Sequence, residues 1–114
     1  MSDKELPKIL NKDSYGLTWY EHAQPYFGSH RGMRYRIARD PMDDVALAPP
    51  DKKGEATFEI IIWPEPFSFD ATEDDKKTKK NFPFTIEGKE EMIVWLNEQY
   101  ESRLDEWEAV RGRY

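Results

Sequence analysis

Two segments of the chain carry the apolar spacing of β-strands. In residues 33–37, Met, Tyr and Ile alternate with two arginines, which is typical of a strand with one buried face. In residues 56–63, both faces become apolar towards the C-terminal end, and this predicts a central strand that is covered on both sides. Pro64 and Pro66 have no N–H to donate to a neighbouring strand, so we expect the strand to end there.

The last quarter of the chain carries a helical spacing. Its apolar residues recur three and four positions apart, at Ile93, Leu96, Tyr100, Leu104, Trp107 and Val110. Thr85 is the expected N-cap of one long helix over residues 86–111. Such a helix is roughly 35 Å long at 1.5 Å per residue, about the width of a domain of this size. We therefore expect its last turns, with Trp107 and Tyr114, to lie along the rim of the domain or to project beyond it.

Three shorter elements are also expected. Residues 18–21 match a capping box, which predicts a short helix over residues 19–24; a strand over residues 16–20 is the alternative, because Trp and Tyr favour strands. Residues 28–32 begin and end with glycine and predict a turn. Residues 73–80 begin with acids and end with lysines, which complements a helix dipole and predicts a short solvated helix.

The other segments are connections and a tail. Residues 41–55 predict a long loop, stiffened by two adjacent prolines. Residues 1–13 are mostly polar and predict either a poorly ordered terminus or a short helix. Together the elements predict a single α+β domain over residues 14–114. In it a small antiparallel sheet packs against the long C-terminal helix, with one or two short helices besides.

Composition excludes several classes of protein. The 114-residue chain has no cysteine and a formal net charge of −6 at pH 7. The lack of cysteine excludes disulfides, thiolate chemistry and cysteine-based zinc sites. The first residues lack the apolar core of a secretory signal, and no apolar run approaches the ~20 residues of a membrane-spanning helix. We expect a cytoplasmic protein, and its acidic balance argues against general nucleic-acid binding.

No residue pattern indicates catalysis or a cofactor. His22 and His30 lack the spacing of metal ligands, and we expect surface or turn positions for both. Glu87, Glu90 and Glu91 cluster where the long helix begins, and the helix dipole favours acids at that end without any chemistry. The sequence therefore predicts no catalytic residue, no cofactor and no metal ligand.

Arginines cluster in the first predicted strand, in the turn before it and directly after it. They are Arg31, Arg34, Arg36 and Arg39. Basic groups set between aromatic ones on an open sheet can bind single-stranded nucleic acid or an acidic protein. The alternative is that Arg34 and Arg36 pair with acids on the neighbouring strand, such as Glu59, because opposite charges facing each other stabilise a sheet.

A group of six aromatic residues also has two interpretations. Its members are Trp63, Phe67, Phe69, Phe82, Phe84 and Trp95. Such rings usually form the core of a small domain, but they could also line an apolar groove. The proline-containing stretch 63–67 could instead present Trp63 and Phe67 to a partner, and exposure of both side chains would favour that interpretation.

Two stretches in the C-terminal half resemble known sequences. They are W-P-E-P-F-S-F-D-A-T at residues 63–72 and W-L-N-E-Q-Y at residues 95–100. Both resemble stretches in short uncharacterised proteins of Gram-positive bacteria and their mobile elements. The resemblance implies a small bacterial accessory protein and no particular reaction.

The sequence as a whole favours a small non-enzymatic module that binds another protein or regulates it. The residues expected at the interaction surface are Arg31, Arg34, Arg36, Trp63, Phe67, Phe69 and Trp107. Two alternatives are nucleic-acid binding through residues 31–39 and mimicry of nucleic acid by the acidic face of the C-terminal helix. The oligomeric state is left open.

Overall fold

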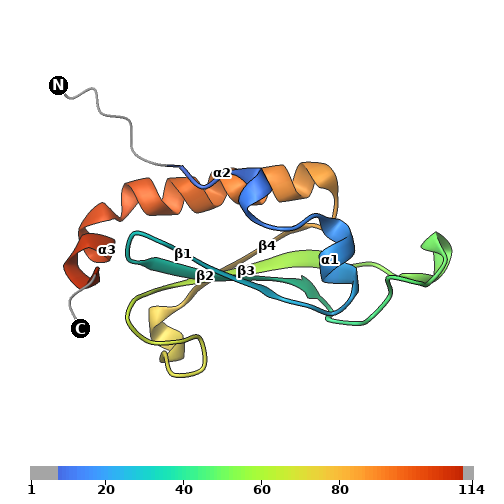
Figure 1. The fold of residues 1–114 in the computed structure, drawn as a ribbon, viewed down its shortest axis with the longest axis horizontal. Helices are drawn as coiled ribbons and strands as arrows, with labels where there is room; N and C mark the ends of the chain where they lie inside the picture. The colour runs from blue at the N-terminus through green and yellow to red at the C-terminus, as the bar shows by residue number, and fades with distance from the viewer. Residues whose placement is uncertain (1–7, 112–114) are drawn as a thin grey trace.

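Among the residues that the structure describes, the sheet has four antiparallel strands in sequence order (Figure 1). A computed structural model describes residues 8–111, so the expectations for residues 1–7 and for Tyr114 lie outside the described residues. The strands are β1 (Tyr26–His30), β2 (Met33–Asp40), β3 (Thr57–Pro64) and β4 (Thr78–Pro83). Each pairs with its sequence neighbour. The predicted α+β fold, with a small antiparallel sheet beside a C-terminal helix, is confirmed.

Helices cover one face of this sheet (Figure 1). They are α1 (Leu17–Glu21), α2 (Ile86–Ser102) and α3 (Leu104–Val110), and short 3-10 turns lie at Asn11–Asp13, Pro50–Lys52 and Asp74–Lys76. The expected N-cap of α2 is confirmed, since Oγ1 of Thr85 accepts a hydrogen bond from the N–H of Gly88 at 2.8 Å. No helix in residues 8–111 is both long and apolar enough to cross a membrane.

The core lies between the helices and the face of the sheet that we call the covered face. On β2 and β3 the covered face consists of Met33, Tyr35, Ile37, Phe58, Ile60 and Ile62, all of them buried. Met92, Ile93, Leu96 and Tyr100 of α2 pack against them. Tyr20 of α1 sets its ring edge-on to Phe58, with 5.3 Å between the ring centroids. The alternate positions form the outer face, with Arg34, Arg36, Glu59, Ile61 and Trp63.

The C-terminal helix is broken, so the expectation of one helix over residues 86–111 is wrong. The backbone leaves helical geometry at Arg103, and α3 follows in a new direction (Figure 1). This turn buries Trp107 completely and brings α3 against the β1–β2 turn, where a Cβ on Gly32 would clash with the carbonyl oxygen of Trp107. Burial of an indole of roughly 200 Å² explains why the chain breaks the helix and does not project past the rim.

Two further expectations about local structure are wrong. Residues 73–80 do not form a helix: a 3-10 turn at Asp74–Lys76 leads into β4. The backbone of β3, buried in the middle of the sheet, needs hydrogen-bond partners on both sides, and β4 supplies them on one side. The turn expected over residues 28–32 is shorter, and only Arg31 and Gly32 form it, both with positive φ. Gly28 instead lies within β1, where the ring of Tyr35 crosses it.

The N-terminal part of the described chain packs on α2. The predicted short helix exists, but it begins two residues early, at Leu17, and no side chain caps it, so the expected capping box does not form. Asn97 of α2 exchanges hydrogen bonds of 2.8 and 2.9 Å with the backbone of Ile9. Lys89, also on α2, donates to the carbonyl of Asn11 at 2.9 Å. Residues 8–13 of the expected tail are therefore held against the helix.

The long loop between β2 and β3 is tied at both ends by one arginine. Arg39 is buried, and it donates to the carbonyls of Pro41 and Lys53 at 2.7 and 2.8 Å. Between these anchors the loop extends away from the sheet (Figure 1), and Leu47 is almost fully exposed. Arg39 thus holds the two ends of the loop together and is not available to a ligand.

Candidate functional site

The tightest turn of the sheet determines which residues of each strand bond to which neighbouring strand; we call this alternation the bonding phase. Two residues join β1 to β2, and His30 faces Met33 across the turn. In such a hairpin the flanking residues bond to each other, and bonded and non-bonded pairs then alternate along the strands. Gly28 and His30 therefore bond to β2, whereas the N–H and C=O groups of Phe27 and Ser29 point to the free edge.

The same phase runs through the other strands. The N–H of Glu65 donates to the carbonyl of Gly32 at 2.9 Å, which makes the even-numbered residues of β2 the ones that bond to β3. The same alternation continues through β3 to β4. The backbone polar groups of Lys79, Asn81 and Pro83 therefore point away from β3, to the free edge of β4.

The β4 edge carries several protective features. Two of its residues are the exposed lysines Lys79 and Lys80, and Pro83 has no N–H to donate. The carbonyl of Pro83 already accepts from the N–H of Thr85 at 2.9 Å. Lysine and proline at an edge are common means by which proteins prevent unwanted strand pairing. The β4 edge is therefore a poor template for another strand.

The β1 edge carries fewer of these features, and they are confined to its start at Pro25. Its sequence, Y-F-G-S-H, contains no residue that is charged at pH 7 when His is neutral. Within residues 8–111 no strand other than β2 pairs with it. Pro25 precedes it, and the carbonyl of Pro25 accepts from Nε1 of Trp19 at 3.3 Å. The outward groups of Phe27 and Ser29 thus form a short segment that another strand could pair with.

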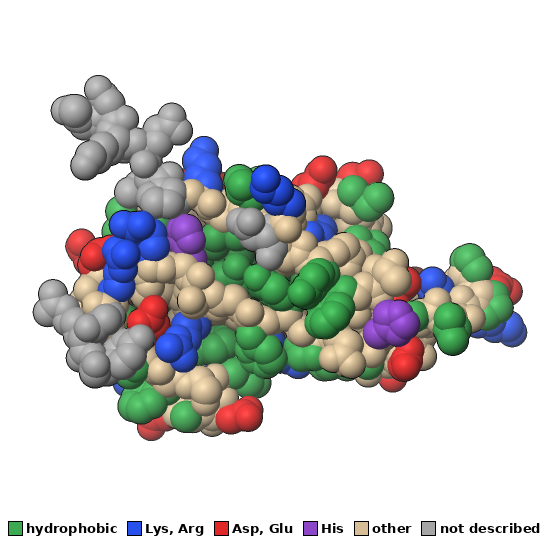
Figure 2. Space-filling model, viewed as in Figure 1, with side chains coloured by type: hydrophobic (Ala, Val, Ile, Leu, Met, Phe, Trp, Pro, Cys, Tyr) green, Lys and Arg blue, Asp and Glu red, His purple; other side chains and the backbone are tan. Residues whose placement is uncertain are grey.

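Exposed aromatic side chains flank this edge on both faces of the sheet. Phe27 projects from the outer face and is 55% exposed. On the covered side Tyr15 is 51% exposed, and it packs against Trp19 and Tyr26 with ring centroids 4.3 and 5.6 Å apart. Figure 2 shows hydrophobic side chains gathered in the middle of this view, near α1 and β1, with most charged side chains toward the periphery.

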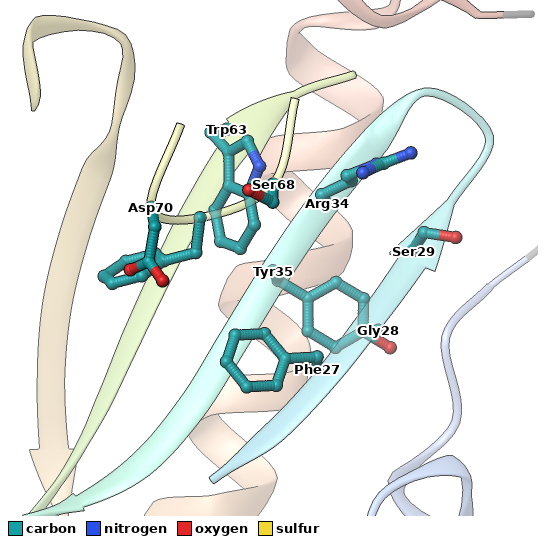
Figure 3. Close-up of a pocket in the computed structure, with 9 residues that line it drawn as sticks. Phe27, Gly28, Ser29, Arg34, Tyr35, Trp63, Ser68 and Asp70 are labelled. Atoms are coloured by element: carbon teal, nitrogen blue, oxygen red, sulfur yellow. The ribbon is translucent and has the colours of Figure 1, made fainter. Parts of the chain in front are cut away.

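A pocket of about 460 Å³ opens on the outer face beside β1. Its lining residues are Phe27, Gly28, Ser29, Arg34, Tyr35, Trp63, Ser68, Phe69 and Asp70. In Figure 3, Arg34 lies beside Ser29 at one end and Phe27 at the other, and Trp63 and Asp70 stand across from β1. The walls are aromatic and the rim is polar, with one cation and one carboxylate on opposite sides.

The far wall of the pocket is the segment that follows β3, folded back over the outer face. The carbonyl of Phe67 accepts from Nε1 of Trp63 at 2.9 Å and from Nη1 of Arg34 at 3.3 Å. The ring of Phe69 lies 5.4 Å from that of Trp63. Trp63 is 2% exposed and Phe67 is 60% exposed. The two side chains are therefore not presented together, and of this pair only Phe67 is open to a partner.

The clustered arginines do not form one basic stripe. Arg36 pairs with Glu59 at 3.3 Å, which confirms the cross-strand alternative for this residue, and Arg39 is buried, as described above. Arg34 has no carboxylate within 4.0 Å among residues 8–111. Arg31 is exposed in the turn. The structure therefore leaves two of these cations near the β1 edge without an acidic partner in the described chain.

The remaining candidates are dispersed. His22 is exposed and forms an isolated bridge with Asp44, whereas the ring of His30 stacks edge-on against Tyr100 at 4.5 Å. Glu87, Glu90 and Glu91 stay exposed on α2. Trp107, fully buried, cannot contact a partner. No three His, Cys, Asp or Glu side chains of the described chain come together in a way that could hold a metal ion.

Comparison of the chain with protein-family models, with curated proteins and with solved structures found no match. The resemblance to small proteins of Gram-positive bacteria therefore stays a hypothesis. The β1 edge itself was not foreseen from the sequence, because residues 28–32 were expected to be a turn. The signal that could have revealed it is the order aromatic, glycine, polar residue, and then a two-residue turn before an alternating strand.

Proposed function

We propose that the protein is a small non-enzymatic protein-binding module that holds an extended segment of another protein along the β1 edge. Strand addition to an exposed edge is a recurring mode of peptide recognition, in which backbone hydrogen bonds supply affinity and side-chain pockets supply specificity. The observation that carries the proposal is the uncharged, unpaired edge at Phe27 and Ser29 with exposed aromatics on both sides.

The contrast within one sheet strengthens this proposal. An open strand edge invites aggregation, and proteins normally protect it with lysine, proline or a covering element. Lysines and a proline lie along β4, whereas at β1 a proline stands only at the start of the strand and leaves Phe27 and Ser29 open. A partner strand would cover the outward groups of Phe27 and Ser29, and it would also shield Phe27 and Tyr15 from water.

The acidic surface of α2 supports a second candidate, the mimicry of nucleic acid. Glu87, Glu90, Glu91 and Glu98 line one shallow groove with Val94. A protein of this kind would compete with DNA or RNA for a basic partner. The candidate rests on charge alone, whereas the β1 edge combines backbone groups, aromatics and a pocket.

Photo-crosslinking from the edge tests the first proposal. Benzoylphenylalanine replaces Phe27 in one variant and Val94 in another; Val94 is 58% exposed and lies on α2. In extracts of the native host we expect a discrete protein adduct from position 27 and none of the same size from position 94. A second substitution in the Phe27 variant shows whether the adduct depends on the edge.

That second substitution is Ser29→Pro, with Ser29→Thr as its matched control. Proline removes the outward N–H of residue 29 without removing a bond to β2, whereas threonine keeps the donor. Loss of one hydrogen bond, with a steric clash from the ring, is expected to weaken the adduct by about tenfold. An adduct that is unaffected by Ser29→Pro, or that forms equally from position 94, contradicts the proposal.

A further inference from the structure

The cation nearest the β1 edge lies one strand inside it. Ser29 of β1 faces Arg34 of β2, and both side chains stand on the outer face. Ser29 is exposed, and its small side chain leaves the space above it open between Arg34 and the edge. Figure 3 shows the two residues side by side at one end of the pocket.

A strand added to β1 would place one of its side chains in line with this pair. Residues of the added strand that bond to Phe27 and Ser29 direct their side chains to the outer face, because directly paired residues share a face. The residue opposite Ser29 would lie two strand spacings, roughly 10 Å, from the backbone of Arg34. An arginine side chain and a carboxylate side chain together span that distance across a serine.

The charges around this position favour an acid. The guanidinium of Arg34 donates to a carbonyl, that of Phe67, and no carboxylate of residues 8–111 lies within 4.0 Å of it. Arg31 stands in the adjoining turn, exposed. Asp70 lies across the pocket from β1 (Figure 3), on the side away from the edge. A carboxylate entering from the edge therefore meets the cations first.

The neighbouring position on the added strand has a different environment. Its side chain lies two residues away on the same face, beside the ring of Phe27. Aromatic and β-branched side chains paired across strands stabilise a sheet, and Phe27, being 55% exposed, has area left to cover. An apolar residue fits here and an acid does not.

We propose that the partner segment is an acidic strand with a carboxylate side chain opposite Ser29 that pairs with Arg34, and an apolar side chain two residues away that packs on Phe27. This inference rests on the proposed function, since it names the chemistry of the segment that the β1 edge holds. Arg34 is a specificity-determining residue in this arrangement, and its hydrogen bond to the Phe67 carbonyl steadies the far wall of the pocket.

A library of ten-residue peptides displayed on phage and selected against the full chain tests the inference. We expect enriched sequences in which Asp or Glu stands two positions from Val, Ile, Phe or Tyr. The charge-assisted hydrogen bond predicts a preference of about tenfold or more for acid over amide at that position. Selection against Arg34→Glu should replace the acid with Lys or Arg, and selection against Arg34→Lys should keep it.

Two controls separate this pairing from general charge effects. Lys79→Glu changes the same amount of charge at the β4 edge and should leave the enriched sequences unchanged. Ser29→Pro should abolish the enrichment, and circular dichroism of each variant verifies that the fold is retained. If Arg34 only supported the fold, Arg34→Glu would weaken binding of all peptides alike. It would not change the preferred peptide charge from acidic to basic.

Several outcomes overturn the inference. These are enrichment with no charge preference, the same sequences on wild-type and Arg34→Glu, enrichment that survives Ser29→Pro, and no enrichment at all. A concentration-dependent dimer that Ser29→Pro dissociates, seen by analytical ultracentrifugation, would assign the edge to a second copy of this chain and also overturn it. If the crosslinked adduct from position 27 depends on Ser29 but not on Arg34, the proposed function stands and the acidic partner falls.

Discussion

The two edge strands, β1 and β4, differ although one register sets the direction of the backbone groups on both. At β4 those groups belong to Lys79, Asn81 and Pro83, and lysine, proline and the bond from Thr85 protect them. At β1 they belong to Phe27 and Ser29, and no described strand covers them. Whether an edge is open to another strand therefore depends on which residues direct their backbone groups outward, and not only on strand order.

Each edge strand contains one phenylalanine, and replacing the two should separate the edges most clearly. Phe82 of β4 is 8% exposed and Phe27 of β1 is 55% exposed. Phe82→Ala should lower the free energy of unfolding by about 3–5 kcal/mol, because it leaves a cavity in the core. Phe27→Ala should lower it by only about 1–2 kcal/mol, because more than half of this side chain is already exposed.

Urea denaturation of both variants measures this difference. If Phe27→Ala destabilises the fold as much as Phe82→Ala does, Phe27 belongs to the core, and the β1 edge is not a free binding surface.

A smaller effect is expected within β1 itself. A Cβ at Gly28 would lie 2.5 Å from Cζ of Tyr35, so Gly28→Ala should cost about 1–3 kcal/mol through overpacking. Ser29→Ala, at the next position on the opposite face, should cost less than about 0.5 kcal/mol. Thermal melting of the two variants checks the prediction, and equal melting temperatures would show that Tyr35 does not lie across Gly28.

The substitution Ser29→Pro should have a still smaller effect on stability. The N–H that it removes points away from β2, so the β1–β2 ladder stays complete, and edge positions with such an outward N–H tolerate proline. We expect a loss below about 1 kcal/mol, and a larger one for Gly28→Pro, which removes a bond to β2. A reversed order, measured by urea denaturation, would show that Ser29 and not Gly28 bonds to β2.

The smallest expected change is in stability with pH. It arises from Lys89 and Tyr20, which lie on neither edge strand, so it should not alter the exposure of the β1 and β4 edges. Burial lowers the pKa of Lys89, so the unfolded chain holds this proton more tightly than the folded chain. The free energy of unfolding should therefore rise as the pH rises from the lowered pKa towards ~10.4, the ordinary value for lysine. Burial also raises the pKa of Tyr20, which lowers stability above pH ~10.

Lys89→Met separates the two contributions. Methionine keeps most of the volume of the lysine stem, and the rise in stability below pH ~10 should disappear in this variant. Urea midpoints between pH 7 and pH ~10 measure it. An unchanged slope would mean that Lys89 is solvated and does not anchor the segment at Asn11.

The sequence predicted the centre of the fold better than its edges. The β2 and β3 strands and the Thr85 cap follow from local spacing and local chemistry, and the Arg36–Glu59 pair follows from facing charges on two clear strands. The sequence does not reveal the β1 strand, because a glycine such as Gly28 usually indicates a turn. Here it is glycine because the ring of Tyr35 lies across it, and this contact is visible only in the folded chain. The acids and lysines of residues 73–80 favour a helix locally, whereas pairing with β3 favours a strand over Thr78–Pro83.

The candidate site was predicted less well for a physical reason. Arg31, Arg34 and Phe67 were expected at an interaction surface. Arg34 lines the pocket on the outer face of the sheet, Phe67 belongs to the segment that forms its far wall, and Arg31 lies in the adjoining turn. Trp107 was expected there as well, but the break at Arg103 buries it. Whether an edge is open depends on strand order and bonding phase, and both follow from the whole sheet and not from any short stretch of residues.

Amide hydrogen exchange, measured with and without the peptide that the display library enriches most, shows whether a strand binds along the β1 edge. In the free protein we predict fast exchange at Phe27 and Ser29 and protection at Gly28 and His30. With the peptide bound, the amides of Phe27 and Ser29 should become protected while those of Lys79 and Asn81 stay fast. Protection at Lys79 and Asn81, or unchanged exchange at Phe27 and Ser29, would contradict binding along the β1 edge.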